Sequence, residues 1–195
     1  MKLHLIGNGP SNKYFDFSDG KRIGCNFSDK KWEPDLTMMA DVKPVLKLYQ
    51  GVSLPCPAII SERAAAFVAG KTMKLSKDRL TIHRVVPFLK RKAIHEKWGM
   101  NSAQHAVWYG IDEYSPTEIH LWGCDSLWST NIESSTDAIV HKDLEFMNTQ
   151  NIYLVWREYW NYIFETYPDI HFYVHAPKKP DLKEVDNLTW VEIPE

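Results

Sequence analysis

Short apolar runs alternate along this chain with segments whose apolar residues recur at helical spacing. Each run stops at a polar residue or a glycine, which is typical of buried strands that end in tight turns. Strands are therefore predicted at 3–6, 22–26, 36–40, 58–60, 118–123, 170–175 and 188–193, and helices at 42–50, 62–69, 103–114 and 152–166.

The helix at 103–114 has the clearest pattern. Its apolar face is built from residues spaced three and four apart, namely Ala103, Ala106, Val107, Gly110, Ile111 and Tyr114. Asn101 or Ser102 is expected to cap its start. Because several residues on this face are small, the helix is expected to pack closely against a sheet. His105 lies between the buried positions and is expected to face solvent or the site edge.

Strands that alternate with helices predict an α/β fold. We expect a Rossmann-like, doubly wound and mostly parallel sheet with helices on both faces. At 195 residues the chain fits one domain, 1–195. The pattern is weak only at 70–99, where eight Lys or Arg residues lie between positions 71 and 92. This stretch is predicted to form a flap or surface excursion.

Polar residues stand directly after several of the predicted strands. They are Asn8, Asn26, Asp41 and Asp125. In a doubly wound sheet, ligands bind outside the carboxyl ends of the strands. The sequence therefore predicts that these four side chains gather at one edge of the sheet and form the binding site.

The turn after the first strand, Gly7-Asn8-Gly9-Pro10-Ser11, is a candidate binding loop. Its glycines offer backbone amides without side-chain hindrance, and such a turn can receive a phosphate or a ribose. The same residues equally suit an ordinary β-turn. Asn12 stands where the dinucleotide fingerprint needs Gly or Ala, which disfavours a nicotinamide or flavin cofactor.

Composition narrows the classes of function. The formal net charge of -2 gives no overall field that attracts nucleic acid or an anionic membrane. The three cysteines are widely spaced and the eight histidines form no His-Glu-x-x-His motif, so no metal site is expected. The sequence holds no signal peptide or membrane span, which predicts a cytoplasmic protein. Aromatic residues at helical spacing in 152–166 indicate a core face or a homo-oligomer interface.

Five segments, taken in order, carry a resemblance to a known superfamily. They are 5–11 (Leu-Ile-Gly-Asn-Gly-Pro-Ser), 24–27 (Gly-Cys-Asn-Phe), 34–41 (ending in Ala-Asp), 101–107 (Asn-Ser-Ala-Gln-His-Ala-Val) and 118–125 (Glu-Ile-His-Leu-Trp-Gly-Cys-Asp). In content and order they resemble the bacterial lipooligosaccharide sialyltransferases and the motility-accessory-factor glycosyltransferases. That superfamily also contains the archaeal hydroxymethylpterin diphosphokinases.

The resemblance implies a sialyltransferase-like glycosyltransferase. Its donor would be a nucleotide-sugar, CMP-linked, its acceptor a glycan or another hydroxyl compound, and no metal or cofactor would be required. The residues implied to bind the donor are Gly7, Asn8, Gly9, Ser11, Asn26, Asp41, Ser102 and Asp125. His141 is implied as the base that takes the proton of the acceptor hydroxyl, since a neutral imidazole near pH 7 can accept it.

One departure from the family pattern leaves other functions open. The sialyltransferases have two tyrosines soon after Gly-x-Asp that steady the leaving phosphate, whereas this chain has Leu127 and Trp128 there. A hydroxymethylpterin-type diphosphokinase would instead use ATP and magnesium, through Asp41 and Asp125. A noncatalytic nucleotide-binding protein would keep the fold without the phosphate-stabilising residues.

Overall fold

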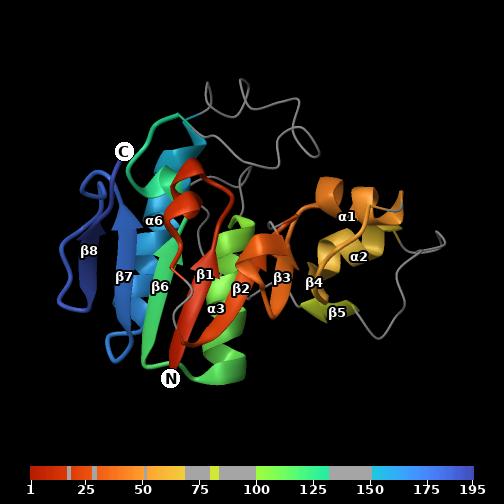
Figure 1. Ribbon diagram of the computed structural model, residues 1–195, viewed down its shortest axis with the longest axis horizontal. Helices are drawn as coiled ribbons and strands as arrows, with labels where there is room; N and C mark the ends of the chain where they lie inside the picture. The colour runs from red at the N-terminus through yellow and green to blue at the C-terminus, as the bar shows by residue number, and fades with distance from the viewer. Residues whose placement is uncertain (17–18, 28–29, 51, 69–79, 84–99, 132–150) are drawn as a thin grey trace.

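The sheet is the central layer of the computed structural model, which describes residues 1–16, 19–27, 30–50, 52–68, 80–83, 100–131 and 151–195 (Figure 1). Within these residues it has eight strands in the order β5-β4-β3-β2-β1-β6-β7-β8. Every neighbouring pair is parallel. The strands are β1 (Lys2–Ile6), β2 (Lys21–Cys25), β3 (Leu36–Met39), β4 (Ala58–Ser61), β5 (Leu80–His83), β6 (Glu118–Trp122), β7 (His171–Ala176) and β8 (Leu188–Glu192).

The order of the strands makes the sheet doubly wound, as predicted. The chain starts at β1 in the middle, moves outward strand by strand to β5, and returns to the other side of β1 as β6. The point where this direction reverses lies between β1 and β6. In doubly wound sheets ligands bind outside the carboxyl ends of the strands, close to this reversal.

Helices cover both faces of the sheet. They are α1 (Val42–Tyr49), α2 (Glu62–Val68), α3 (Ser102–Tyr114) and α6 (Ile152–Thr166). Successive residues of a strand point to opposite faces. Met38 joins the core cluster that contains residues of α3 and α6, whereas Met39 joins the cluster that contains residues of α1 and α2. The prediction of helices on both faces is therefore confirmed.

Helix α3 packs directly on the central strands. A side chain at Gly110 would collide with Leu3 of β1, so the close approach expected from the small residues is confirmed. Asn101 caps this helix: its side chain accepts a hydrogen bond from the Gln104 N–H at 3.0 Å, and the Gln104 side chain accepts one from the Asn101 N–H. The start of α3 is thus fixed at the carboxyl edge of the sheet.

The structure refines two sequence-based predictions. Residues 80–83, within the predicted flap at 70–99, form β5 and extend the sheet beside β4; four residues are too few to show a strand pattern among basic neighbours. The rest of 70–99 lies outside the described residues. His105 is buried rather than facing solvent. The neighbouring Gln104 side chain donates to the Trp156 carbonyl at 2.7 Å, so α6 contacts the first turn of α3.

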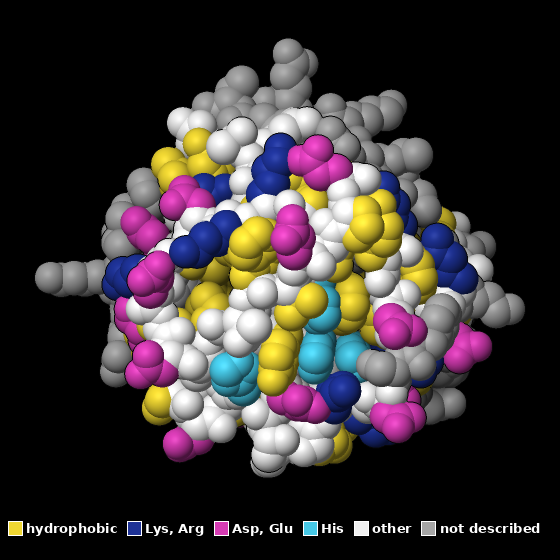
Figure 2. All heavy atoms as spheres, turned by 60° about the vertical axis from the view of Figure 1, so that its left-hand side comes forward, with side chains coloured by type: hydrophobic (Ala, Val, Ile, Leu, Met, Phe, Trp, Pro, Cys, Tyr) yellow, Lys and Arg dark blue, Asp and Glu magenta, His cyan; other side chains and the backbone are white. Residues whose placement is uncertain are grey.

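Histidines line one face of β1, β6 and β7, opposite the α3 and α6 core. They are His4, His120, His171 and His175, and Figure 2 shows histidine side chains gathered among hydrophobic ones on this side. The His120 Nδ1 and the His175 Nε2 are 2.9 Å apart and share a hydrogen bond. The indole of Trp122 stacks on His175 with ring centroids 3.4 Å apart. No helix of the described chain has the length and hydropathy to cross a membrane.

Candidate functional site

The polar residues predicted to gather after the strands do share one edge of the sheet. Asn8 follows β1, Asn26 follows β2, Asp41 follows β3 and Asp125 follows β6. Because all these strands are parallel, their carboxyl ends point the same way. Within this edge the residues form two groups. Ser11 and Asp125 lie where the Gly7–Gly9 turn meets the end of β6, and Asn8 of the turn lies toward Asn26 and Ser102 on the β2 side.

The Gly7–Gly9 turn is fastened to the end of β6. The Gly7 N–H donates to the Trp122 carbonyl at 2.7 Å, and the Gly9 N–H donates to the Gly123 carbonyl at 2.9 Å. A Cβ atom at Gly7 would collide with the Gly123 carbonyl oxygen. These glycines are needed because two backbone segments touch. Their amides are engaged in the fold, which corrects the expectation that they are open to a phosphate.

Ser11 and Asp125 reinforce the same junction. Ser11 is at the start of the short 3-10 helix η1 (Pro10–Tyr14), and Asp125 begins the 3-10 helix η5 (Asp125–Leu127). The Ser11 N–H donates to Asp125 Oδ2 at 3.0 Å, and the Ser11 hydroxyl donates to Oδ1. Both side chains are buried. Their hydrogen bonds join turns that are 114 residues apart in the sequence.

The second group is Asn8, Asn26 and Ser102. The Asn8 Nδ2 donates to the Cys25 carbonyl at 2.8 Å, while its Oδ1 is buried without a hydrogen-bond partner. The Ser102 hydroxyl donates to Asn26 Oδ1 at 3.3 Å and accepts from the Ala40 N–H at 3.2 Å. Ser102 is the first residue of α3. Amide and hydroxyl groups therefore meet at the N-terminus of a helix, where negative charge is favoured.

Asp41 lies beside this second group. It is exposed and precedes α1, but its side chain makes no capping hydrogen bond to that helix. Its neighbour Ala40 binds Ser102 through the backbone. Asp41 is thus positioned on the solvent side of the group around Ser102.

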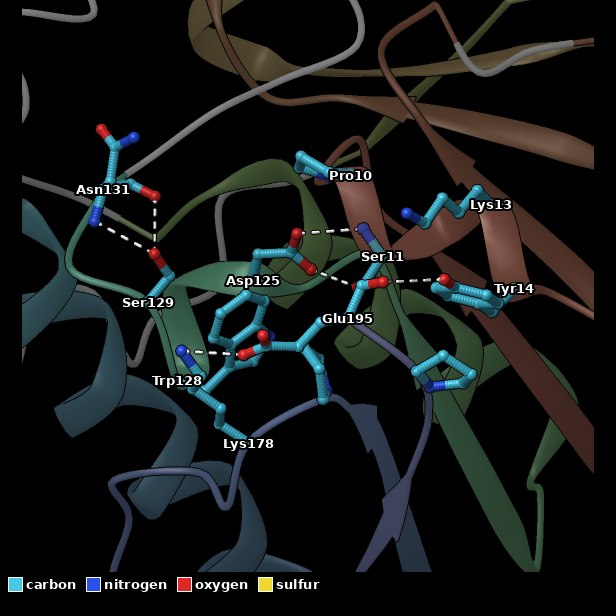
Figure 3. A pocket seen from close by; sticks show the side chains of 12 residues that line it. Pro10, Ser11, Lys13, Tyr14, Asp125, Trp128, Ser129, Asn131, Lys178 and Glu195 are labelled. Atoms are coloured by element: carbon cyan, nitrogen blue, oxygen red, sulfur yellow. Dashed lines mark hydrogen bonds and ion pairs between the residues drawn. The ribbon is translucent and has the colours of Figure 1, made fainter.

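A pocket of about 270 Å³ opens on the other side of the Gly7–Gly9 turn (Figure 3). It lies at the carboxyl ends of β6, β7 and β8, and its lining includes Ser11, Lys13, Asp125, Trp128, Lys178 and Glu195. Four of these residues were not predicted from the sequence as site residues: Lys13, Trp128, Lys178 and Glu195. The sequence pattern could have indicated Lys178 and Glu195, because each is a polar residue a few positions after a predicted strand.

The described cysteines are poorly suited to thiolate chemistry, and the described residues offer no cluster of metal ligands. Cys25, Cys56 and Cys124 are buried thiols that form no disulfide. Burial raises the pKa of Cys25 to about 12 and raises that of Cys124 as well, so these two thiols stay protonated near neutral pH. The described ranges contain no group of three or more His, Cys, Asp or Glu side chains placed to hold a metal ion.

Comparison with known proteins adds no family assignment. No protein-family model, curated protein or solved structure matches the chain. The resemblance to the sialyltransferases therefore remains a hypothesis carried by the five sequence segments. His141, the base it implies, lies outside the described residues.

Proposed function

We propose that this chain binds a CMP-linked nucleotide-sugar between the ends of β1, β2 and β3 and transfers the sugar to a hydroxyl acceptor. The observation that carries the proposal is the hydrogen bond between Asn26 and Ser102 at the N-terminus of α3, with Asn8 bound to the carbonyl of Cys25, the residue before Asn26. Their order along the chain is also that of the segments that resemble the sialyltransferases. The resemblance further implies that the transfer needs no metal.

The helix supplies the attraction for the donor phosphate. A helix N-terminus carries unsatisfied N–H groups and a partial positive charge, which together bind phosphate. In α3 the capping box uses the N–H groups of Asn101 and Gln104. Ser102, whose hydroxyl bonds Asn26 and Ala40, is the first residue of the helix and lies between those two residues in the sequence. We assign phosphate binding to this helix end, because the Gly7 and Gly9 amides already bind β6.

Asn8 would recognise the nucleoside of the donor through a hydrogen bond. A buried acceptor without a donor costs about 1–3 kcal/mol, and Asn8 Oδ1 is such an acceptor. A ribose hydroxyl or the amino group of cytosine would donate to it. The rigid junction of Gly7 and Gly9 with β6 holds Asn8 in place for that contact.

The transfer itself is a displacement at the anomeric carbon. The acceptor oxygen forms a bond to that carbon while the bond from the carbon to the phosphate oxygen breaks, and CMP leaves with the electron pair. The acceptor proton goes to the base, assigned to His141. The diphosphokinase alternative is less well supported, because Asp125 is buried and both its oxygens accept hydrogen bonds from Ser11.

Nucleotide binding can be tested by thermal unfolding. CMP at about 100 times its Kd should stabilise the protein by about 2.7 kcal/mol, which raises Tm by roughly 5–10 °C for a chain of this length. The rise should not depend on magnesium. Asn26→Asp keeps the side-chain shape and the acceptor for Ser102 but adds a negative charge beside the phosphate, so it should abolish the rise.

Asn161→Asp is the matched control, since Asn161 lies on α6 and accepts a hydrogen bond from the Lys183 N–H. It should keep the full response to CMP. UDP and ATP, each with and without magnesium, complete the comparison. A magnesium-dependent response to ATP alone would favour the kinase, and no response to any nucleotide would refute the donor site.

The assignment of the base has its own test. His141→Ala should retain the Tm rise with CMP but lose transfer activity by about a hundredfold, the lower end of the usual contribution of a general base. The activity is measured as CMP released from a CMP-sugar in the presence of an acceptor. Full activity in this variant would exclude His141 as the base.

A further inference from the structure

The pocket of about 270 Å³ beside the donor site has its own chemistry. It shares Ser11 and Asp125 with the junction that anchors the Gly7–Gly9 turn. The pocket therefore lies on the β6, β7 and β8 side of the turn that contains Asn8. The donor groups around Ser102 lie on the β2 and β3 side.

Trp128 forms an aromatic wall of this pocket. Figure 3 shows its indole between Asp125 and Lys178. The side chain is only partly buried, yet its Nε1 is buried without a hydrogen-bond partner. An indole with accessible surface offers a flat apolar face to a ligand.

The charged groups of the pocket already have contacts within the protein. Lys178 Nζ pairs with Glu195 Oε1 at 2.9 Å, and Lys13 Nζ lies 4.8 Å from the centre of the Tyr14 ring. The Asp125 carboxylate holds Ser11. A charged ligand would have to compete with these contacts, so the pocket favours an uncharged one with many hydroxyl groups.

We propose that this pocket binds one uncharged sugar ring, whose apolar face packs on Trp128 and whose hydroxyls meet the polar rim. As an acceptor site this rests on the proposed function, and the ring would then supply the hydroxyl oxygen that attacks the donor. The volume is slightly below that of a drug-sized ligand site, about 300–1,000 Å³, and so matches a single ring better than an oligosaccharide.

The test is a titration with simple glycosides followed by nuclear magnetic resonance. The probes are the methyl glycosides of galactose, glucose and N-acetylglucosamine, with galacturonate as the charged comparison. At least one neutral glycoside should bind with Kd in the millimolar range, about -4 kcal/mol. It should shift the indole N–H signal of Trp128, which is assigned by its absence from the spectrum of Trp128→Phe.

Two variants locate the binding. Trp128→Ala should raise the Kd for that glycoside by about tenfold, as expected for an aromatic packing contact of about 1.4 kcal/mol. Trp128→Phe keeps a ring and should stay within about threefold of the wild type. Trp190→Ala is the matched control, because Trp190 is exposed on β8 and lines a different pocket; it should bind like the wild type.

The outcomes separate this inference from the donor site. If CMP raises Tm but no neutral glycoside shifts the Trp128 signal, or if galacturonate binds best, the sugar pocket is wrong and the donor site stands. If a glycoside binds at Trp128 but no nucleotide binds, the pocket stands and its role as acceptor site fails. If Trp128→Ala loses the CMP response together with glycoside binding, the two sites are not separate and the inference is overturned.

Discussion

Gly7→Ala should lower the free energy of unfolding by about 3 kcal/mol, at the upper end of the usual cost of overpacking. The added Cβ would meet the backbone carbonyl of Gly123 rather than a movable side chain. The two backbones cannot separate easily, because β1 and β6 are paired along their whole length up to Ile6 and Trp122. Urea denaturation, with the midpoint and slope compared with the wild type, measures the loss.

The contact between Gly7 and Gly123 can also be tested by a substitution at Gly123. Gly123 has a φ of 62°, which favours glycine, and a Cβ there would lie 2.6 Å from the Gly7 carbonyl oxygen. Gly123→Ala should therefore be at least as destabilising as Gly7→Ala. The double variant should lose less than the sum, since both substitutions disrupt one contact.

Asp16→Ala is the control for this series, because Asp16 is exposed just after η1 and its loss should change stability by less than about 0.5 kcal/mol. The glycine variants should also weaken CMP binding, since Asn8 lies between Gly7 and Gly9. A Gly7→Ala protein with wild-type stability would contradict the close contact between the two turns, and with it the rigid placement of Asn8.

The elements that the sequence predicted best are those whose pattern is long. The helix predicted at 152–166 has the bounds of α6, and the helix predicted at 103–114 differs from α3 by one residue. Strand ends were also well predicted, because a polar residue after an apolar run marks where a strand leaves the core. Parallel pairing then brings Asn8, Asn26, Asp41 and Asp125 to one edge without further information.

The partners of the backbone amides could not be predicted in this way. Whether the Gly7 N–H faces a ligand or a carbonyl depends on how closely the turn approaches β6, and that segment is more than 100 residues away in the sequence. The hydrogen bond from the Gln104 side chain to the Trp156 carbonyl of α6 likewise joins residues that are 52 apart in the sequence. The pocket around Trp128 draws on three strand ends and η1, so no single segment carries its signal.

The histidine face of the sheet makes the stability of the protein depend on pH. Burial lowers the pKa of His120 to about 4 and that of His175 to about 3. Nearby positive charge from His4 and Lys2 lowers the pKa of His120 further, while Glu118 acts in the opposite direction. Both rings are therefore neutral in the folded protein at pH 5, where they would be protonated in the unfolded chain.

Acid should consequently destabilise the fold well before its carboxylates are protonated. Between pH 6.5 and 4 the unfolded chain binds more protons than the folded protein, so the free energy of unfolding falls as pH falls. The two protons of His120 and His175 give a slope of up to about 2.7 kcal/mol per pH unit. Burial also lowers the pKa of His4, which adds to the slope in the same direction. The loss ends once the pH is below the folded pKa values, and above pH 6.5 these two groups leave stability unchanged.

Replacing one ring should remove about half of that slope. The glutamine of His120→Gln can still hydrogen-bond His175 but does not titrate. Between pH 6 and 4.5 the slope of the free energy of unfolding against pH should therefore be smaller than in the wild type by about 1.4 kcal/mol per pH unit. Tyr173→Phe is the control, because this ring stacks on His120 at 4.5 Å between centroids and the substitution keeps the ring and leaves every histidine in place. Urea denaturation at half-unit steps of pH measures all three proteins. Equal slopes in wild type and His120→Gln would mean that His120 titrates alike in the folded and unfolded chain, which would contradict its burial against His4 and His175.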